Sequence, residues 1–168
     1  LPFITGTICA HNCMTKCTRN FYDEPVNIRA TKLVAAEKGY NTYMSKLRPP
    51  VPAGTNTRVA VVGGGPTGMA AAYFIGRAGI PVTLYEKTDR LGGIVRHVIP
   101  SFRISDNAID KDEALMRKMG VEVKLSTPAP SAAELKAMGY THIFYAVGAG
   151  KAGALNIPGN VVPVIAWL

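Results

Sequence analysis

The chain has 168 residues, of which 48% are hydrophobic, and its formal net charge at pH 7 is +8. This length suffices for one ordinary domain with a small appendage. The sequence contains no apolar run of about eighteen residues and no signal-peptide pattern at its start, so we expect a soluble, cytoplasmic protein without a membrane partner. The basic residues are dispersed, which argues against a nucleic-acid partner and favours a solvated surface, a phosphate-bearing cofactor or an acidic partner.

All three cysteines lie near the beginning of the chain. They are Cys9, Cys13 and Cys17, at a C-x3-C-x3-C spacing with His11 in the first gap. From these residues alone, four interpretations stay open: a disulfide with one thiol left over, three structural thiols, a zinc site that includes His11, and iron–sulfur ligation. A radical-SAM site fits poorly, because its usual spacing is C-x3-C-x2-C and it precedes a barrel.

The chain is predicted to divide near residue 50. Residues 26–47 carry apolar residues at helical spacing, which predicts a helix. Residues 48–57, RPPVPAGTNT, are rich in Pro and Gly and are interpreted as a linker. We therefore expect a helical, cysteine-containing segment over residues 1–50 and a second domain over residues 51–168. The side chains of the first helix that we expect to be buried are Val26, Ile28, Leu33, Val34 and Tyr40.

From Arg58 onward, strand and helix patterns alternate. Pro66 suits the first turn of a helix and Gly79 suits its end, Asp106 or Asn107 can begin another helix, and Ser131 can cap a third. This alternation predicts an α/β fold, a parallel sheet with helices on both faces. The predicted elements are a strand at 58–62, a helix at 66–79, a strand at 81–87, a mostly loop segment at 88–105, a helix at 106–120, a strand at 121–125, a helix at 131–139 and a strand at 141–147.

A glycine motif lies between the first strand and the helix that follows it. Gly63, Gly65 and Gly68 form a G-x-G-x-x-G pattern, which in this context predicts a dinucleotide-binding turn. The first glycine permits the tight turn, the second lets the backbone approach a pyrophosphate, and the third lets helix and strand pack closely. The helix N-terminus would offer N–H groups to the phosphates. The alternative is a plain turn that requires glycines for its own geometry.

An acidic residue and a second glycine pair narrow the choice of dinucleotide. Glu86 ends the second predicted strand, where a carboxylate accepts hydrogen bonds from ribose hydroxyls and disfavours a 2′-phosphate, so we expect FAD or NAD rather than NADP. Gly92 and Gly93 follow in EKTDRLGG. This E-x5-G-G pattern resembles that of flavoproteins of the glutathione-reductase type, which favours FAD.

The segments GGIVRHVIPSFRIS, MRKMGVEVKLSTP and YTHIFYAVGAGKAGALNIPG extend this resemblance. Nearly the whole chain resembles the FAD-binding and iron–sulfur portion of a family that includes the glutamate synthase small subunit, dihydropyrimidine dehydrogenase and the selenate reductase flavoprotein subunit. CTRNFYDEPVNIR most resembles the selenate reductase type. The resemblance implies a Rossmann-like FAD-binding domain behind a cysteine-bearing helical segment. It also implies an NAD(P)H-dependent flavoprotein oxidoreductase that passes electrons through FAD to [4Fe–4S] clusters.

The resemblance also implies roles for individual residues. Arg103 would contact the phosphates or the flavin, although a surface role stays open, and the backbone around Ala129 would flank the adenine. Residues 146–148 would make a second glycine turn. His97 and His142 belong to no motif and are interpreted as surface or strand residues, and no catalytic side chain is expected because the cofactors carry the reaction. The implied FAD-binding residues are Gly63, Gly65, Pro66, Thr67, Gly68, Glu86, Lys87, Gly92, Gly93, Ile94, Arg103, Ala129, Ala146 and Gly148.

In this family context, iron–sulfur ligation becomes the favoured interpretation of Cys9, Cys13 and Cys17. The pattern nevertheless departs from that of the relatives, which have a longer C-x3-C-P-x5-C-x3-C segment. Lys32 aligns with the position of their Gln or Glu ligand, and a lysine will not bind iron there. We therefore expect no complete [4Fe–4S] cluster in this chain, with the missing ligands elsewhere in the protein.

Only one G-x-G-x-x-G pattern of this chain, at residues 63–68, lies between a predicted strand and a predicted helix, whereas complete members of the family carry a second such turn in an NAD(P)H-binding domain. We expect a piece of a longer enzyme that binds FAD weakly or not at all, is inactive alone, and works with the remaining domains or a partner oxidoreductase subunit. Two alternatives stay open: a non-catalytic dinucleotide-binding module and a zinc-stabilised interaction protein. The electron acceptor, and the choice between NADH and NADPH, cannot be read from these residues.

Overall fold

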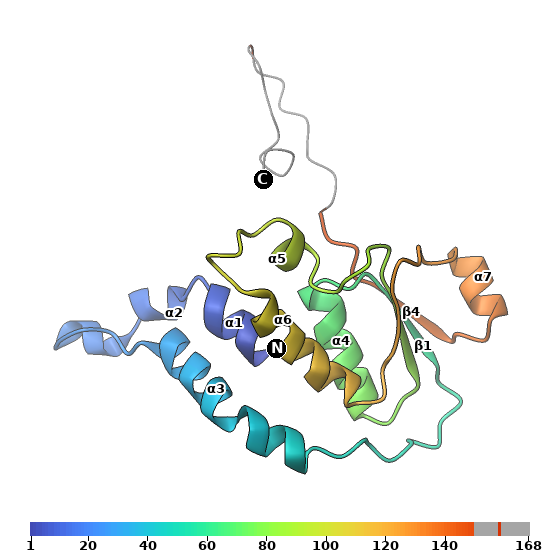
Figure 1. Cartoon of the computed structure of the whole chain (residues 1–168), viewed down its shortest axis with the longest axis horizontal. Helices are drawn as coiled ribbons and strands as arrows, with labels where there is room; N and C mark the ends of the chain where they lie inside the picture. Colours follow the sequence, from blue (N-terminus) through green and yellow to red (C-terminus); the bar gives the residue numbers. More distant parts are fainter. Residues whose placement is uncertain (150–157, 159–168) are drawn as a thin grey trace.

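Four parallel strands form the centre of the protein in our computed structural model, which describes residues 1–149 and Pro158 (Figure 1). Their order in the sheet is β3-β2-β1-β4, and every pair of neighbours is parallel. Parallel strands require a crossover between them, and helices supply it here. The strands are β1 Val59–Val62, β2 Val82–Tyr85, β3 Glu122–Lys124 and β4 His142–Tyr145.

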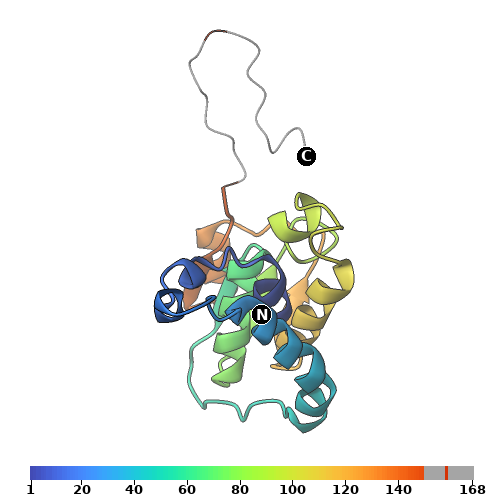
Figure 2. The same ribbon diagram turned by 90° about the vertical axis from the view of Figure 1, so that its left-hand side faces the viewer.

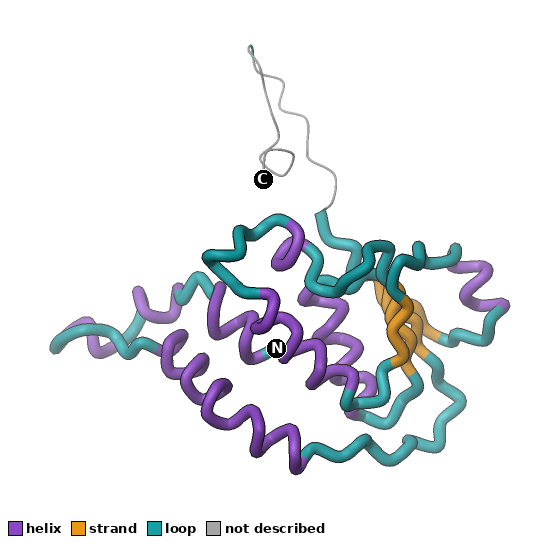
Figure 3. The backbone as a smooth tube through the Cα atoms, viewed as in Figure 1, coloured by secondary structure: helices purple, strands orange, loops and turns teal. Residues whose placement is uncertain are grey.

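Helices flank this sheet and extend to one side of it (Figure 3). α4 and α6 pack against each other, and α4 contacts β1 and β2. α1 packs on both α3 and α6, which attaches the N-terminal helices to the α4–α6 side of the molecule. The helices are α1 Pro2–Ile8, α2 Asn12–Thr15, the 3-10 helix η1 Thr18–Phe21, α3 Ile28–Lys46, α4 Pro66–Arg77, α5 Ile94–His97, α6 Asp106–Arg117 and α7 Ala132–Ala137.

The strands bury alternate residues on the two faces of the sheet. Val59 and Val61 of β1 join the main hydrophobic core, which also holds residues of α4 and α6. Ala60, between them, joins a smaller core that contains Leu135 of α7. Alternation places successive side chains on opposite faces, so apolar residues at every position of β1 indicate helices on both sides. The expected α/β architecture, a parallel sheet with helices on both faces, is confirmed.

The ends of the helices test the expected capping residues. Ser131 caps α7, and its side chain and that of Glu134 form a reciprocal capping box, as expected for Ser at this position. For α6 the cap is Ser105, whose Oγ accepts a hydrogen bond from the backbone N–H of Ala108. The helix begins at Asp106, as predicted, and the serine before it supplies the cap. α5 was missed within 88–105, since four residues carry too little periodicity.

The expected buried face of α3 is wrong. No residue of α3 is buried, and Val26, Ile28 and Val34 are all exposed. α3 packs against α1, and a cavity of about 370 Å³ lies among α3, α1, α4 and α6. Apolar spacing therefore predicted the helix correctly, but burial depends on which elements surround it.

A buried carboxylate on α6 holds the start of the chain against the α/β part of the protein. Asp112 of α6 accepts hydrogen bonds from the backbone N–H groups of Phe3, at 3.2 Å, and Ile4, at 2.7 Å. These donors lie in the first turn of α1, where N–H groups have no partner within the helix. Burial raises the pKa of Asp112 more than these hydrogen bonds lower it. Ile4 itself lies in the main core.

The predicted division near residue 50 stays a prediction. Residues 47–58 run from the end of α3 back to β1 (Figure 2), and the Ala53 backbone N–H donates to Gly79 O at the end of α4. Among residues 1–149, no helix combines the length and the apolar character that crossing a membrane requires.

Candidate nucleotide-binding site

The glycine turn joins β1 to α4, and two of its glycines are required by close backbone contacts. A Cβ atom on Gly63, whose φ is +107°, would lie 2.4 Å from Ala146 O. A Cβ on Gly68 would lie 1.8 Å from Gly63 O, so only glycine lets α4 pack on the turn. Gly65 differs, because its Cβ would meet nothing nearer than the Gly93 Cα atom at 3.9 Å. The space in front of Gly65 is therefore open to a ligand.

A pocket of about 500 Å³ lies at the carboxyl ends of β1, β2 and β4. Open parallel sheets bind their ligands at this edge. Most of the predicted FAD-binding residues line it, namely Gly63, Gly65, Pro66, Thr67, Glu86, Lys87, Gly93, Ile94, Ala146 and Gly148. The sequence did not single out the other lining residues, Gly64, Thr88, Val95, His97, Val98, Val147 and Ala149.

The remaining predicted residues lie away from the pocket lining. Gly68 and Gly92 lie behind it, in contact with Gly63 and Arg96 respectively. Arg103 lines a separate pocket beside α1, α3 and α6, so the structure does not bring it to the glycine turn. Ala129 packs against the smaller core near α7. The predicted segment beyond residue 149, apart from Pro158, lies outside the described residues.

The second glycine pair contacts the first glycine turn, backbone to backbone. The Gly92 N–H donates to Gly64 O at 2.8 Å. Gly93 has a φ of +53°, and a Cβ there would lie 2.9 Å from the Gly65 Cα atom. Glycines permit both this conformation and this approach. The two motifs, far enough apart to be read separately in the sequence, thus form one continuous wall of the pocket.

Glu86 connects the end of β2 to the glycine turn. Its Oε2 accepts a hydrogen bond from the Gly64 N–H at 2.6 Å, and its Oε1 accepts from the N–H and the Oγ1 of Thr88, both at 2.9 Å. Burial would raise the pKa of Glu86, but the hydrogen bonds from Thr88 and Gly64 together outweigh it, so the pKa is lowered. A negative charge is therefore held at the pocket wall where ribose hydroxyls would donate.

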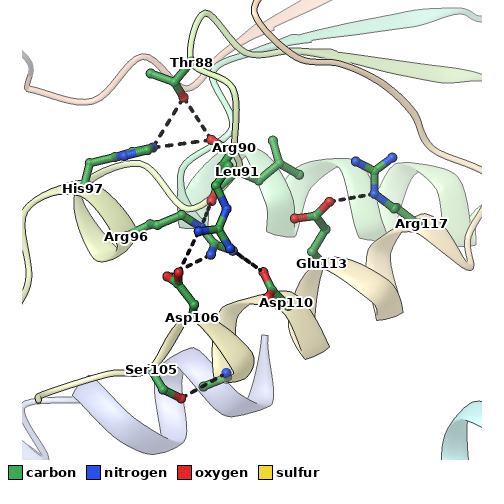
Figure 4. A network of polar contacts seen from close by, with 11 residues as sticks. Thr88, Arg90, Leu91, Arg96, His97, Ser105, Asp106, Asp110, Glu113 and Arg117 are labelled. Atoms are coloured by element: carbon green, nitrogen blue, oxygen red, sulfur yellow. Dashed lines mark hydrogen bonds and ion pairs between the residues drawn. The ribbon is translucent and has the colours of Figure 1, made fainter. Parts of the chain in front are cut away.

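His97 is a pocket residue that sequence reasoning missed. Its Nε2 atom lies 3.4 Å from Thr88 Oγ1, the hydroxyl that also contacts Glu86 (Figure 4). Isolated histidines carry no motif, so only its position one helical turn after Gly93 could have suggested this placement. The contact extends the polar wall from Glu86 to α5.

The cysteines do not converge. Cys9 is the C-cap of α1, Cys13 lies in α2, and Cys17 is the N-cap of η1. His11 has a φ of +47°, a left-handed conformation that ends any continuous helix between the thiols. In residues 1–149, no group of three or more His, Cys, Asp or Glu residues is arranged to hold a metal. This arrangement does not fit a cluster, and iron–sulfur ligation stays a prediction from the resemblance.

The three thiols are also unpaired and differ in their surroundings. All three cysteines are free, and Cys13 is exposed. The backbone hydrogen bonds from Val26 and Arg19 lower the pKa of Cys17. The thiols therefore lie at the surface as separate groups in this structure.

Comparison with known proteins relates the chain to oxidoreductases. The model of the NAD(P)-binding Rossmann-like domain family matches residues 61–107, which contain the glycine turn, Glu86 and α5. YgfK of Escherichia coli (strain K12), named as an oxidoreductase, is 40% identical over 161 residues, 95% of this chain and 16% of YgfK. The glutamate synthase [NADPH] small chain of Mycobacterium tuberculosis (strain CDC 1551 / Oshkosh) is 34% identical over 95% of this chain and 33% of its own length.

A solved structure gives the same assignment. A complex of 2-naphthoyl-CoA reductase with 2-naphthoyl-CoA is 34% identical, with a TM-score of 0.53, over 64% of this chain and 16% of that chain. The chain thus spans between about a sixth and a third of the length of these relatives. The predicted resemblance to the glutamate synthase group is confirmed, and the chain corresponds to one part of larger proteins.

Proposed function

We propose that this chain, which is similar to a part of oxidoreductases that include the glutamate synthase small chain, is the FAD-binding part of an NAD(P)H-dependent iron–sulfur flavoprotein. The observation that carries this proposal is the contact between the two glycine segments. A Cβ on Gly93 would lie 2.9 Å from Gly65 Cα, yet a Cβ on Gly65 would project into open space. The pocket therefore has a bare backbone wall that an extended dinucleotide can approach closely.

Residues of this chain would bind the phosphates and the ribose at separate points. Pro66 begins α4, a helix of 12 residues whose first turn faces the pocket, so its N–H groups and positive dipole end suit the pyrophosphate. The Glu86 carboxylate would accept hydrogen bonds from the adenosine ribose, and its charge would repel a 2′-phosphate. Gly93 and Ile94 would border the path of the cofactor toward the flavin end.

FAD, when bound, supplies the redox chemistry, because a flavin accepts a hydride from NAD(P)H and releases single electrons. This chain's own residues would bind and orient the cofactor. The NAD(P)H site, the clusters and the electron acceptor would lie in other domains or in a partner subunit. Cys9, Cys13 and Cys17 would contribute to cluster binding only after a rearrangement that brings their thiols together.

The test is a titration of FAD into the wild-type chain and into Gly65→Ala. The added methyl group meets no protein atom within 3.9 Å, so the fold should be unchanged while the approach of a pyrophosphate is blocked. We expect the FAD dissociation constant to rise by about tenfold or more, the equivalent of one good phosphate contact. Circular dichroism and thermal unfolding would verify that the variant stays folded.

Gly39→Ala provides the matched control, because Gly39 lies in α3 and a Cβ there would have no neighbour within 4 Å. It should leave FAD affinity unchanged. Parallel titrations with NAD⁺ and NADP⁺ separate the alternatives. Preferential binding of NAD⁺ would favour a dinucleotide module that is not a flavoprotein, and equal FAD affinity of wild type and Gly65→Ala would contradict the proposed site.

A further inference from the structure

Arg96 is a buried cation that the nucleotide site does not itself use. Its side chain is only 3% exposed, although it belongs to the short helix α5 at the surface. The Nε atom donates to Leu91 O at 2.5 Å, and the Nη2 atom donates to Asp110 Oδ1 at 2.5 Å (Figure 4). The Nη1 atom lies 2.9 Å from Asp106 Oδ1, an ion pair without the alignment of a hydrogen bond.

The two aspartates lie one turn apart on α6 and also face Arg90. Arg90 Nη1 lies 2.6 Å from Asp106 Oδ2, and Arg90 Nη2 lies 3.5 Å from Asp110 Oδ1. The hydrogen bond from Arg90, with the charge of Arg96, lowers the pKa of Asp106, so the Asp106 carboxylate stays ionised near neutrality. Arg96 is therefore held in one orientation by two hydrogen-bond acceptors and one further ion-pair partner, on two different segments.

Behind the pocket wall, this guanidinium packs directly against a glycine. A Cβ on Gly92, whose φ is +122°, would lie 2.7 Å from Arg96 Cβ and 3.3 Å from Ile109 Cγ2. On its other side, the Gly92 N–H donates to Gly64 O in the first glycine turn. Gly92 is thus enclosed between the Arg96 cluster and the turn that faces the ligand.

We propose that Arg96 is a positioning residue for the dinucleotide pocket. Its contacts with Asp106, Asp110 and Leu91 O fix the start of α5 and press the Gly92–Gly93 backbone against Gly64 and Gly65. This inference rests on the proposed function for its ligand, FAD, but it concerns how the pocket wall is built. α6, which contributes no residue to the pocket lining, thereby determines the shape of that wall.

A guanidinium is suited to this task because of its geometry. Arginine presents several donors in a rigid planar fork, so several acceptors fix both the position and the direction of the side chain. A buried charge adds little net stability compared with an apolar side chain of the same volume. The arrangement therefore contributes orientation of the Gly92–Gly93 segment, which an apolar residue filling the same space would leave less defined.

The test compares Arg96→Met with Arg117→Met. Methionine fills a similar volume without donors, and Arg117 is a suitable control because it is an arginine of α6 that pairs with one acid, Glu113, away from the pocket. The first measurement is hydrogen exchange of the Gly92 amide in the chain without nucleotide. The second is the FAD dissociation constant of each variant.

We expect Arg96→Met to accelerate Gly92 exchange and to weaken FAD binding, each by about tenfold or more, which matches the loss of one charge-assisted hydrogen bond. Arg117→Met should change both by about twofold or less, the size of an exposed pair. Arg96→Lys, which can reach one of the two aspartates, should restore part of both values. If Arg96 had only a structural role, Arg96→Met would lower the stability of the protein, and Arg96→Lys would not slow the exchange of the Gly92 amide again.

If Arg96→Met does not fold, Asp110→Asn replaces it, since Asp106 then keeps one contact with Arg96. The positioning role is wrong if Gly92 exchange and FAD affinity in the Arg96 and Asp110 variants match those of Arg117→Met. If wild type binds NAD⁺ in preference to FAD yet Gly92 exchange still rises in Arg96→Met, the proposed function fails and the positioning of the glycine pair stands.

Discussion

The glycine pocket and the cysteine segment both rest on regular spacing in the sequence, but the structure treats them differently. Gly63, Gly65 and Gly93 converge on one pocket wall, with backbone atoms in contact. Cys9, Cys13 and Cys17 share an equally regular spacing, yet they lie in three separate elements and form no metal-binding group within residues 1–149.

The difference comes from what surrounds each motif. The glycines follow strands of one parallel sheet, and hydrogen bonds between those strands bring their carboxyl ends to the same edge. The cysteine spacing would align the three thiols on one side only if they lay on a single continuous helix. The left-handed conformation of His11 interrupts such a helix. Regular spacing in the sequence therefore predicts a site when other elements of the fold bring the spaced residues together.

The largest effect should come from Gly68→Ala. A Cβ at this position would lie 1.8 Å from Gly63 O, and the backbone must move to relieve the contact. We expect a loss of about 3 kcal/mol or more in the free energy of unfolding, measured by urea denaturation, because overpacking against backbone cannot be relieved by a rotamer change. Full stability of Gly68→Ala would show that α4 does not need this close contact with the turn.

The next effect concerns the anchor between the two regions. Asp112→Ala removes both acceptors from the N–H groups of Phe3 and Ile4 and should lower the free energy of unfolding by about 1–3 kcal/mol. Amide exchange of Phe3 and Ile4 should accelerate more than that of β1. Asp89→Ala, at an exposed loop position, is the control and should change stability little. Equal stability of the two variants would mean that α1 is held by apolar contacts alone.

The pH dependence of the pocket should follow Glu86. Its pKa is lower in the folded protein than in the unfolded chain, so its contribution to stability is present above the ordinary glutamate pKa. That contribution is lost as the pH falls through the lowered pKa of the folded state. The difference in unfolding free energy between wild type and Glu86→Gln should therefore shrink in acid, and a difference independent of pH would contradict this assignment.

The smallest effect should come from replacing Cys9, Cys13 and Cys17 together by serine. Because the thiols are free and none is fully buried, we expect a change in unfolding free energy within about 0.5 kcal/mol and an unchanged FAD affinity. Iron and sulfide analysis after anaerobic reconstitution provides the sharper measurement. A content near four irons per chain would mean that the cysteines and further ligands gather when metal is present. The cysteine segment would then form one site, as the glycine segments do.

The succession of strands and helices, the glycine turn and the position of Glu86 at the end of a strand could all be predicted from the amino-acid sequence. These features depend on local signals, such as alternating burial in β1, Pro66 at a helix start and glycines at a strand end, which act over a few neighbouring residues. The resemblance extended this knowledge to Gly93 and Ile94, which do line the pocket. Arg103 shows the limit, because a motif does not determine the path of the loop that carries it.

The contacts between groups far apart in the chain could not be predicted and depend on the fold as a whole. Gly92 donates to Gly64, Asp112 holds the first turn of α1, and Arg96 lies between the acids of α6 and the glycine pair. The exposure of α3 and the separation of the three thiols likewise depend on tertiary packing. Each depends on packing between residues far apart in the chain, where burial, desolvation and backbone contact act together and no short pattern records the result.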